Sequence, residues 1–426
     1  MNGAHRAALA LVLTLASAAP AQEALEGAFD KGDSSFSSGQ SRSETKLDGP
    51  DAGARRGWTE IKQRVRFGRY ALLTQQRLDP ATGFPPEKQG WGDVFVGLEG
   101  QKPAVYMSSN WSPWNFLDAR VTLAGDAEPL PSPARSGRAV YARLWEETPE
   151  RLGAEAVFVD RAGGLLRARL TGWRDSTRFG LSLAYAPPAG REVAQLTYEL
   201  VCQPYDIHER EEPLRERWLS TPSRALKLDA ERPATLDPGA EFQAVFHNRQ
   251  GQLTSGTLLA CDAGSVGEVQ AELRQKAIVV SIRPRSAGAP VVLALSDWVD
   301  RTYTLEARDF FAQAEAVKAE LKRAAEWTLP APPPPAPAEG AEALWLCAAH
   351  GDLAPAWRER TNAAWTALKD AHASAFPFLK PAQPVPDSPE LLRARVGYVE
   401  AERAWATLWR ELRRAWVREA CWAQEP

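Results

Sequence analysis

Short runs of alternating apolar and polar residues dominate the chain from Trp58 to about Val299. This period of two is typical of antiparallel strands with one buried face, and the glycines and prolines between the runs indicate turns. Helical periodicity is nearly absent from this part of the chain. The strands predicted from the pattern cover residues 65–67, 70–73, 93–96, 104–107, 120–123, 139–145, 154–159, 165–170, 179–185, 195–202, 242–246, 258–261, 278–282 and 291–295.

The periodicity becomes helical over residues 304–327. Apolar residues recur there at spacings of four and three, with charges between them, at Phe310, Ala314, Val317, Leu321 and Ala324. This spacing predicts one amphipathic helix that packs against the preceding strands. We therefore expect a mainly β fold with α. Residues 58–328 would form a large antiparallel β-sandwich region, either one sandwich or two stacked ones, that ends in this helix.

A proline run over residues 329–340 separates this region from a second helical one. Proline fixes φ and lacks an N–H donor, so we expect an extended, semi-rigid linker. Residues 341–426 then predict a separate small helical domain. Its helices are expected at 341–349, 353–375 and 389–421, with Ser388 as the N-cap of the last helix and Pro389 at its first position.

Residues 1–21 have the pattern of a cleavable signal peptide. His5 and Arg6 form a basic start, an apolar run of about ten residues follows, and a small-x-small site precedes Gln22. The apolar run is shorter than the roughly 20 residues that a membrane-spanning helix needs. We therefore expect an exported protein, either periplasmic or extracellular. Residues 22–57 are rich in Ser, Gly and charge, which predicts a disordered leader or linker.

Composition narrows the classes of partner. The 426 residues carry a formal net charge of −3, so no basic excess is present to neutralise phosphates, and nucleic acid is not an expected partner. No stretch of the mature chain is apolar enough to predict a membrane span. The chain has 16 tryptophans, whose large rings either fill cores or contact ligands.

Four cysteines remain after removal of the signal peptide, at positions 202, 261, 347 and 421. An even number in an oxidising compartment favours disulfides. Three pairings are possible. We expect Cys202–Cys261 and Cys347–Cys421, because each of these bonds stays within one proposed domain. Four buried free thiols are the alternative.

Short catalytic and metal-binding motifs are missing from the sequence, which has no C-x-x-C, H-E-x-x-H, G-x-S-x-G or phosphate loop. We therefore expect neither a metal nor a cofactor. His208 begins the segment HEREE, where a neighbouring carboxylate could support acid–base chemistry, although a solvated acidic loop is the commoner explanation. Glycosidases that use two carboxylates need no short motif, so enzymatic activity stays open, with a non-enzymatic role preferred.

The segment 89–118 is the candidate ligand site. It combines aromatic rings with amides and carboxylates, which suit the C–H faces and the hydroxyls of a sugar. A well-packed corner of the sandwich, with tryptophans in the core, would give the same pattern. The candidate ligand-binding residues are Trp91, Asp93, Asn110, Trp111, Trp114 and Asn115.

The C-terminal segment from about 345 to 421 has a second aromatic pattern. Trp405, Trp409 and Trp416 recur at helical spacing. Tryptophans in this arrangement usually fill the core of a small bundle, and the alternative is an exposed face that docks a partner protein.

The same segment resembles LprI-type lysozyme inhibitors. The resemblance rests on an Asn-x-x-aromatic element at 362–365 and an Ala-x-Arg-Ala-Trp element at 401–405, or Arg414-Ala415-Trp416 before Cys421. Relative to that family, Trp405 lies too far from the closing cysteine and Trp416 too near it. The resemblance implies an envelope protein that binds another protein.

Together these observations predict an exported, non-enzymatic binding or inhibitor protein of the cell envelope. One alternative is a carbohydrate-binding or carbohydrate-active protein that uses the region of Trp111 and Trp114. A structural envelope protein is a further alternative. The expected partner is an envelope protein or a glycan.

Overall fold

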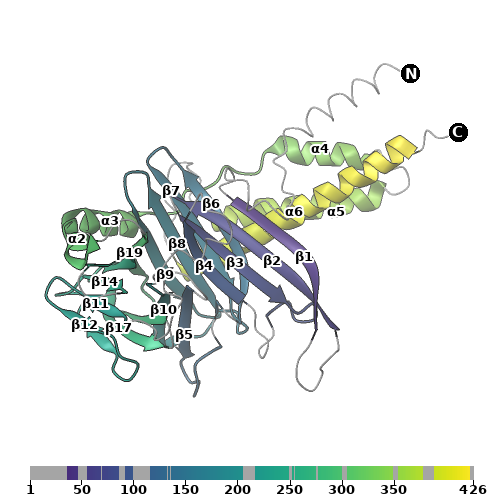
Figure 1. Cartoon of the computed structure of the whole chain (residues 1–426). Coiled ribbons are helices and arrows are strands. Elements are labelled where there is room, and N and C mark those ends of the chain that lie inside the picture. The colour runs from purple at the N-terminus through teal and green to yellow at the C-terminus, as the bar shows by residue number, and fades with distance from the viewer. Residues whose placement is uncertain are drawn as a thin grey trace.

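The computed structural model arranges the chain in three layers (Figure 1). A nine-stranded sheet forms the middle layer, two smaller sheets lie on one face, and helices lie on the other. The mainly β fold with α that the sequence predicts is confirmed. The structure describes residues 36–46, 55–68, 70–85, 92–98, 116–131, 133–134, 136–204, 216–248, 252–253, 255–274, 277–299, 305–348, 354–377 and 388–422.

The middle sheet has the strand order β12-β11-β14-β16-β19-β9-β8-β7-β6, and all its neighbours are antiparallel. Every residue of β8 and β16 is buried, because both faces of these strands are covered. The strands are β6 (Arg138–Glu147), β7 (Arg151–Val159), β8 (Leu165–Trp173), β9 (Arg178–Ala186), β11 (Trp218–Ser220), β12 (Ala225–Lys227), β14 (Gln243–His247), β16 (Ser255–Cys261) and β19 (Val291–Val299).

The second layer consists of a four-stranded and a five-stranded sheet. The first has the order β1-β2-β3-β4 and comprises β1 (Phe36–Lys46), β2 (Arg55–Phe67), β3 (Tyr70–Leu78) and β4 (Gly92–Leu98). The second has the order β13-β17-β18-β10-β5 and comprises β5 (Leu117–Leu123), β10 (Val193–Cys202), β13 (Ala234–Leu236), β17 (Val266–Arg274) and β18 (Ala277–Pro284). Two short strands, β15 (Gln252–Leu253) and β20 (Leu305–Glu306), pair with each other and form a separate two-stranded sheet.

The backbone of Phe116 joins the two smaller sheets. Its N–H donates to the carbonyl of Val94 at 2.7 Å, and its carbonyl accepts from the N–H of Val201 at 3.0 Å. One continuous hydrophobic core therefore lies between the middle sheet and both smaller sheets. Tyr70 and Phe179 meet in this core with ring centroids 4.6 Å apart. This arrangement is the large β-sandwich that the alternating pattern predicts.

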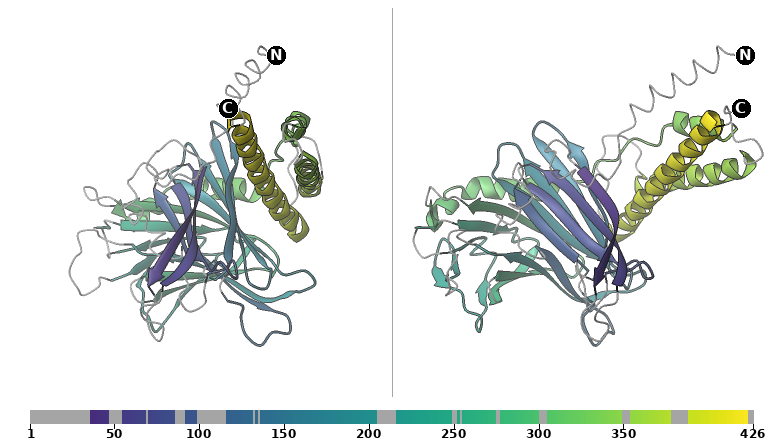
Figure 2. Two further views of the ribbon diagram at one scale, coloured as in Figure 1. Left: turned by 90° about the vertical axis from the view of Figure 1, so that its right-hand side faces the viewer. Right: turned by 45° about the vertical axis from the view of Figure 1, so that its right-hand side comes forward.

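Helices cover the outer face of the middle sheet. The short α2 (Ala307–Phe311) leads into α3 (Ala314–Glu326), which packs on β9, β16 and β19. The other helices are α4 (Pro337–Ala348), α5 (Ala354–Ala375) and α6 (Pro389–Trp422). Helix α6 contacts β6 and β9, and the three helices extend from there beyond the sheets (Figures 1 and 2). None of the helices in the described part of the chain is long and apolar enough to cross a bilayer.

A buried ionic network ties α6 to the middle sheet. Glu155 on β7 is fully buried and accepts from Arg169 on β8 at 2.9 Å and from Arg395 on α6 at 3.3 Å. The hydroxyl of Tyr141 donates to the same carboxylate at 2.6 Å. Burial alone raises the pKa of Glu155, but Arg395, Arg169 and Arg167 outweigh it and lower this pKa to about 2. The carboxylate is therefore ionised and pairs with guanidinium groups beneath the helix.

The helical region shares its packing with the sheet. Leu329, in the predicted linker, is fully buried, and α4 already begins at Pro337. One hydrophobic cluster contains Val140 and Val157 of the sheet together with residues of α4, α5 and α6. The helices expected at 341–349, 353–375 and 389–421 are found within a few residues of their predicted bounds, and their apolar residues share this cluster with the sheet.

The start of the last helix has the predicted cap. The backbone N–H of Leu391 donates to the Ser388 hydroxyl at 3.2 Å, and Pro389 is the first helical residue. The predicted single helix over 304–327 is interrupted instead, since α2 ends at Phe311 and α3 begins at Ala314.

Two further differences from the sequence prediction concern strands. Residues 36–46, placed in a disordered leader, form β1 and pair with β2 along its whole length. Backbone hydrogen bonds form such a ladder whatever the side chains, so a run rich in serine can form a strand. Strands β11, β12, β13, β15, β17 and β20 were also not predicted. The signal peptide, residues 1–21, and the strand expected at 104–107 lie outside the described residues.

The predicted bond between Cys202 and Cys261 is wrong, because both are free buried thiols. Cys202 lies on β10 and Cys261 on β16, in opposite layers of the sandwich. Cys347 is also a free thiol, and its sulfur lies 3.3 Å from the Thr361 hydroxyl. The side chain of Cys421, its predicted partner, lies outside the described residues.

The tryptophan stripe of the last helix belongs to the helical packing. Trp405 is only 6% exposed, and its ring lies 5.0 Å from that of Trp365 on α5. Trp409 stacks on Trp405 at 6.0 Å, and Trp416 packs against the same cluster. These tryptophans therefore pack in the core of the helical region, as the sequence pattern predicts. The likeness of this segment to LprI-type inhibitors stays a prediction.

Candidate functional site

The outer face of the five-stranded sheet carries a dense set of polar side chains. Residues alternate along its strands, so that apolar side chains point into the sandwich core and polar ones away from it. On β17, Val269 and Ala271 are buried while Gln270 between them is partly exposed. Among the described residues, no helix makes substantial contact with this sheet, whose outer face therefore has no helix over it.

Strand register aligns these polar residues in rows across the sheet. Gln270 on β17 pairs with Ser281 on β18, which pairs with Glu199 on β10. In the neighbouring row, Glu268 pairs with Arg283. At the other edge, Thr197 on β10 pairs with Arg120 on β5. Four adjacent strands therefore contribute seven polar side chains to one surface, which we call the polar sheet face: Arg120, Thr197, Glu199, Glu268, Gln270, Ser281 and Arg283.

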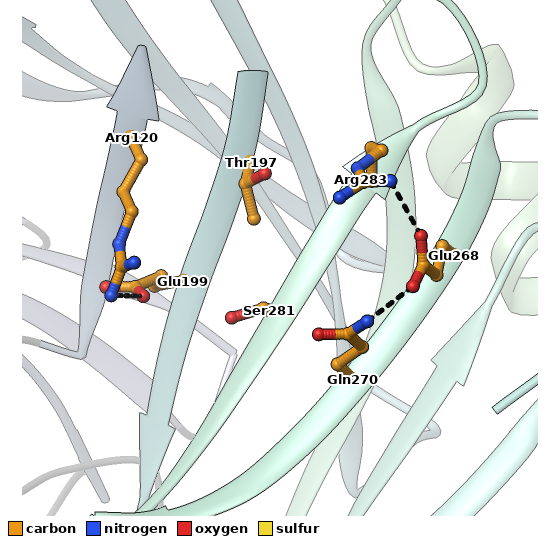
Figure 3. A pocket seen from close by; sticks show the side chains of 7 residues that line it. All are labelled: Arg120, Thr197, Glu199, Glu268, Gln270, Ser281 and Arg283. Carbon is orange, nitrogen blue, oxygen red and sulfur yellow. Dashed lines mark hydrogen bonds and ion pairs between the residues drawn. The ribbon is translucent and has the colours of Figure 1, made fainter. Parts of the chain in front are cut away.

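Ion pairs hold the charged members of this face in place (Figure 3). Arg120 and Glu199 approach to 2.7 Å, and Arg283 and Glu268 to 2.8 Å. The Gln270 amide also donates to Glu268 at 2.5 Å. Because each guanidinium faces a carboxylate, the charges on the face balance. The same seven residues line a shallow hollow of about 170 Å³.

Further charges extend the network at the rim. Arg274 on β17 lies 3.5 Å from Glu199 and also pairs with Glu272. Burial alone lowers the pKa of Arg274, but the carboxylates of Glu272 and Glu199 outweigh it and raise this pKa. The Arg274 guanidinium therefore keeps its proton and its charge at neutral pH.

This arrangement suits hydrogen bonding to a neutral, hydroxyl-rich ligand. A hydroxyl both donates and accepts, so it can donate to Glu268 and accept from Arg120 or Arg283, while the buried Glu199 holds Arg120 in place. The neutral side chains supply further donors and acceptors. Over the part of the chain that the structure covers, no group of three or more His, Cys, Asp or Glu residues could hold a metal ion.

The site predicted from the sequence lies almost entirely outside the described residues. Trp91, Asn110, Trp111, Trp114 and Asn115 are not described, and neither is the segment 208–212. Of Asp93, the backbone alone is described, and it pairs on β4 with Gln75 of β3. The structure therefore neither brings these residues together nor separates them.

The polar sheet face was missed by reasoning from the sequence. Strands β10 and β18 were predicted, so the alternation of Thr197, Tyr198 and Glu199 was already visible. Without β17 and without the strand order, nothing indicated that Glu268 and Gln270 would join them. The signal that could have found β17 is the alternation of Glu268, Val269, Gln270, Ala271 and Glu272.

A second hollow, of about 640 Å³, lies where the turns after β6 and β8 meet α3. Its lining residues include Trp173, Glu150 and Arg174. Trp173 would be a stacking surface for a sugar, but it is only 3% exposed because Arg323 lies 5.0 Å above its ring. The indole is therefore not open to a ligand.

A serine and a histidine also meet inside the middle sheet. The hydroxyl of Ser220 lies 2.8 Å from Nε2 of His247. Both residues are buried, at 4% and 2% exposure, and neither borders the two hollows described above. A nucleophile needs a path for its substrate, so this contact is best explained as a satisfied buried polar pair.

No protein-family model and no curated protein matches the chain. Among solved structures it is similar to the GH36 α-galactosidase AgaA from Geobacillus stearothermophilus, with 11% identity, a TM-score of 0.36, and coverage of 56% of this chain and 41% of that one. It is similar to the α-N-acetylgalactosaminidase NagBb from Bifidobacterium bifidum, in its quadruple mutant, with 14% identity, a TM-score of 0.32, and coverage of 68% and 42%. The chain thus spans about two fifths of these structures, and nothing about ligands follows from the similarity.

Proposed function

We propose that this protein binds carbohydrate on the polar sheet face. The observation that supports the proposal is the balanced set of donors and acceptors that four adjacent strands present around one hollow. Ligand sites in general use a small number of placed polar groups to fix orientation. Here the ion pairs fix those groups before any ligand arrives, which reduces the entropy lost on binding.

The charge balance favours a neutral ligand over a charged one. Arg120 and Arg283 are each matched by a carboxylate, so a phosphate or a carboxylate ligand would have to compete with Glu199 or Glu268. A sugar hydroxyl can add to these pairs without breaking them, because each carboxylate oxygen has more than one acceptor site.

The size of the hollow limits the ligand to one ring. Its volume of about 170 Å³ is below the roughly 300–1,000 Å³ of sites that enclose drug-sized molecules. No aromatic ring lines the described hollow, so stacking does not contribute. We therefore expect weak binding, with dissociation constants near ~1 mM for a single sugar unit.

The test is a comparison of two double variants on a glycan array and by titration calorimetry of the sugars that bind. Gln270→Ala with Ser281→Ala removes two neutral hydrogen-bonding groups and leaves the Arg120–Glu199 and Arg283–Glu268 pairs in place. Gln195→Ala with Thr122→Ala is the matched control, since these residues face each other on β10 and β5 outside the hollow.

The first double variant should lose binding at least about tenfold, because each lost hydrogen bond is worth about 1 kcal/mol. The control should bind like the unmodified protein. Equal binding by both variants, or no sugar bound by the unmodified protein, would contradict the proposal.

A further inference from the structure

The far end of the helical region carries the large hydrophobic side chains that the described part of the chain leaves exposed. They are Trp345 on α4, at 53% exposure, and Val417 on α6, at 47%. Both lie near the C-terminal ends of their helices, in the part that extends away from the sheets (Figures 1 and 2). Exposed apolar side chains that gather at one protruding end are a feature of interaction sites.

Side-chain contacts place these two residues on the same end. Arg413 on α6 lies 3.7 Å from Glu342 on α4. Trp345 follows Glu342 by three residues and Val417 follows Arg413 by four, so each lies about one helical turn farther along. Gly340 on α4 lies under the ring of Trp365, and this ring packs against Trp405 on α6. Because the Glu342–Arg413 pair lies farther along both helices than this contact, α4 and α6 run in the same direction.

The same end has an excess of arginine. Arg360 pairs with Glu411 at 2.9 Å. Arg358, Arg410, Arg414 and Arg418 are exposed and make no ion pair within the described residues, and the hydrogen bonds of Arg410 and Arg418 go to their own helix.

Arg413, Arg414, Arg418 and Val417 also line an open hollow of about 580 Å³. We call the exposed set the helical tip: Trp345, Val417, Arg358, Arg410, Arg414 and Arg418.

We propose that the helical tip docks on an anionic phospholipid surface. Arginine stems bury their methylene groups while the guanidinium stays among headgroups, and tryptophan prefers the same interfacial layer. A stable protein interface buries about 800 Å² on each side around an apolar, charge-depleted centre, whereas the tip presents two exposed apolar side chains among arginines. A lipid surface has no such minimum area, and each basic residue near it adds to the attraction.

The experiment is co-sedimentation of the full chain with vesicles. One set contains phosphatidylcholine alone, and the other an equimolar mixture with phosphatidylglycerol. The unmodified protein should pellet with the anionic vesicles only, and added salt should reduce the pelleted fraction, because salt screens exposed charges.

Reversing the charge of two tip arginines tests whether vesicles bind at the tip or at another part of the surface. Arg414→Glu with Arg418→Glu should reduce the partition coefficient at least about 25-fold, since each basic residue near an anionic surface contributes a factor of roughly five. Arg232→Glu with Arg308→Glu is the matched control. Arg232 is exposed between β12 and β13, and Arg308 is exposed on α2, so this variant should bind within about twofold of the unmodified protein.

A second variant keeps the charge and removes the apolar groups. Trp345→Ser with Val417→Ser should weaken binding to anionic vesicles while circular dichroism stays unchanged, because neither side chain is buried. Failure of the unmodified protein to pellet with anionic vesicles overturns the proposal, and so does equal loss in the control double variant. If the tip variants reduce capture of an acidic protein and vesicles have no effect, the partner is a protein and the lipid proposal is wrong.

Discussion

Replacing Glu155 by glutamine should destabilise this protein more than replacing Arg395, the arginine that crosses from α6. The Glu155 carboxylate is fully buried among the side chains of Arg169, Arg395 and Tyr141. Removing its charge leaves buried guanidinium groups without that carboxylate. Breaking a buried pair in this way costs about 3–5 kcal/mol.

The substitution Arg395→Met has a smaller expected effect. Glu155 keeps Arg169 at 2.9 Å and Tyr141 at 2.6 Å, so its carboxylate stays paired. Methionine fills part of the arginine volume, and because the Glu155 carboxylate still faces Arg169, the full cost of leaving a buried charge uncompensated does not arise. We expect a cost below about 2 kcal/mol for Arg395→Met, with Arg410→Met on an exposed face as the control within about 0.5 kcal/mol.

The pH dependence provides an independent measure. The pKa of Glu155 falls from 4.5 to about 2 on folding, so the unfolded chain binds the proton more tightly. Its contribution to stability is complete above pH ~4.5 and disappears as the pH falls from there towards ~2, for a total of about 3 kcal/mol. Glu155→Gln should lack this part of the acid dependence.

The assay is urea unfolding followed by tryptophan fluorescence between pH 7 and pH 3, which the 16 tryptophans make sensitive. Free energies of unfolding are compared for the unmodified protein and the three variants. A cost for Arg395→Met equal to or above that for Glu155→Gln would refute the reasoning. So would an acid dependence that Glu155→Gln leaves unchanged.

Three other substitutions or modifications test separate parts of the packing. Gly172→Ala should destabilise by about 1–3 kcal/mol in urea unfolding, because a Cβ there would lie 2.5 Å from the backbone nitrogen of Gly68. Ser388→Ala should cost about 1 kcal/mol in the same assay, since it removes the cap of α6; an unchanged midpoint would exclude that role. Burial raises the pKa of the Cys261 thiol to about 12 and that of Cys202 well above its usual value, so both should resist alkylation until the protein unfolds, as mass spectrometry can show. Rapid alkylation of the folded protein would contradict their burial.

The candidate site shows where sequence reasoning stopped. Alternation on β10 and β18 identifies polar residues such as Glu199 and Ser281 that must leave the core face. It does not say which strands are neighbours. Ser281 and Glu199 are some 80 positions apart, and their pairing depends on the strand order β13-β17-β18-β10-β5. Which residues form a row across the sheet is therefore determined by the strand order.

The sequence by itself determined the periodicity of this protein, because local hydrophobic spacing fixes which segments can be strands and which can be helices. It predicted most of the described sandwich strands, the start of α6 at Ser388 and Pro389, and the core role of the last tryptophans. The tertiary structure determined which residues each face of a strand or helix contacts. Glu155 and Arg395 are 240 positions apart, and only the docking of α6 on the middle sheet buries them together. Cys202 and Cys261 are free thiols on different sheets, and the layer to which each strand belongs is set by long-range packing that spacing along the chain does not reveal.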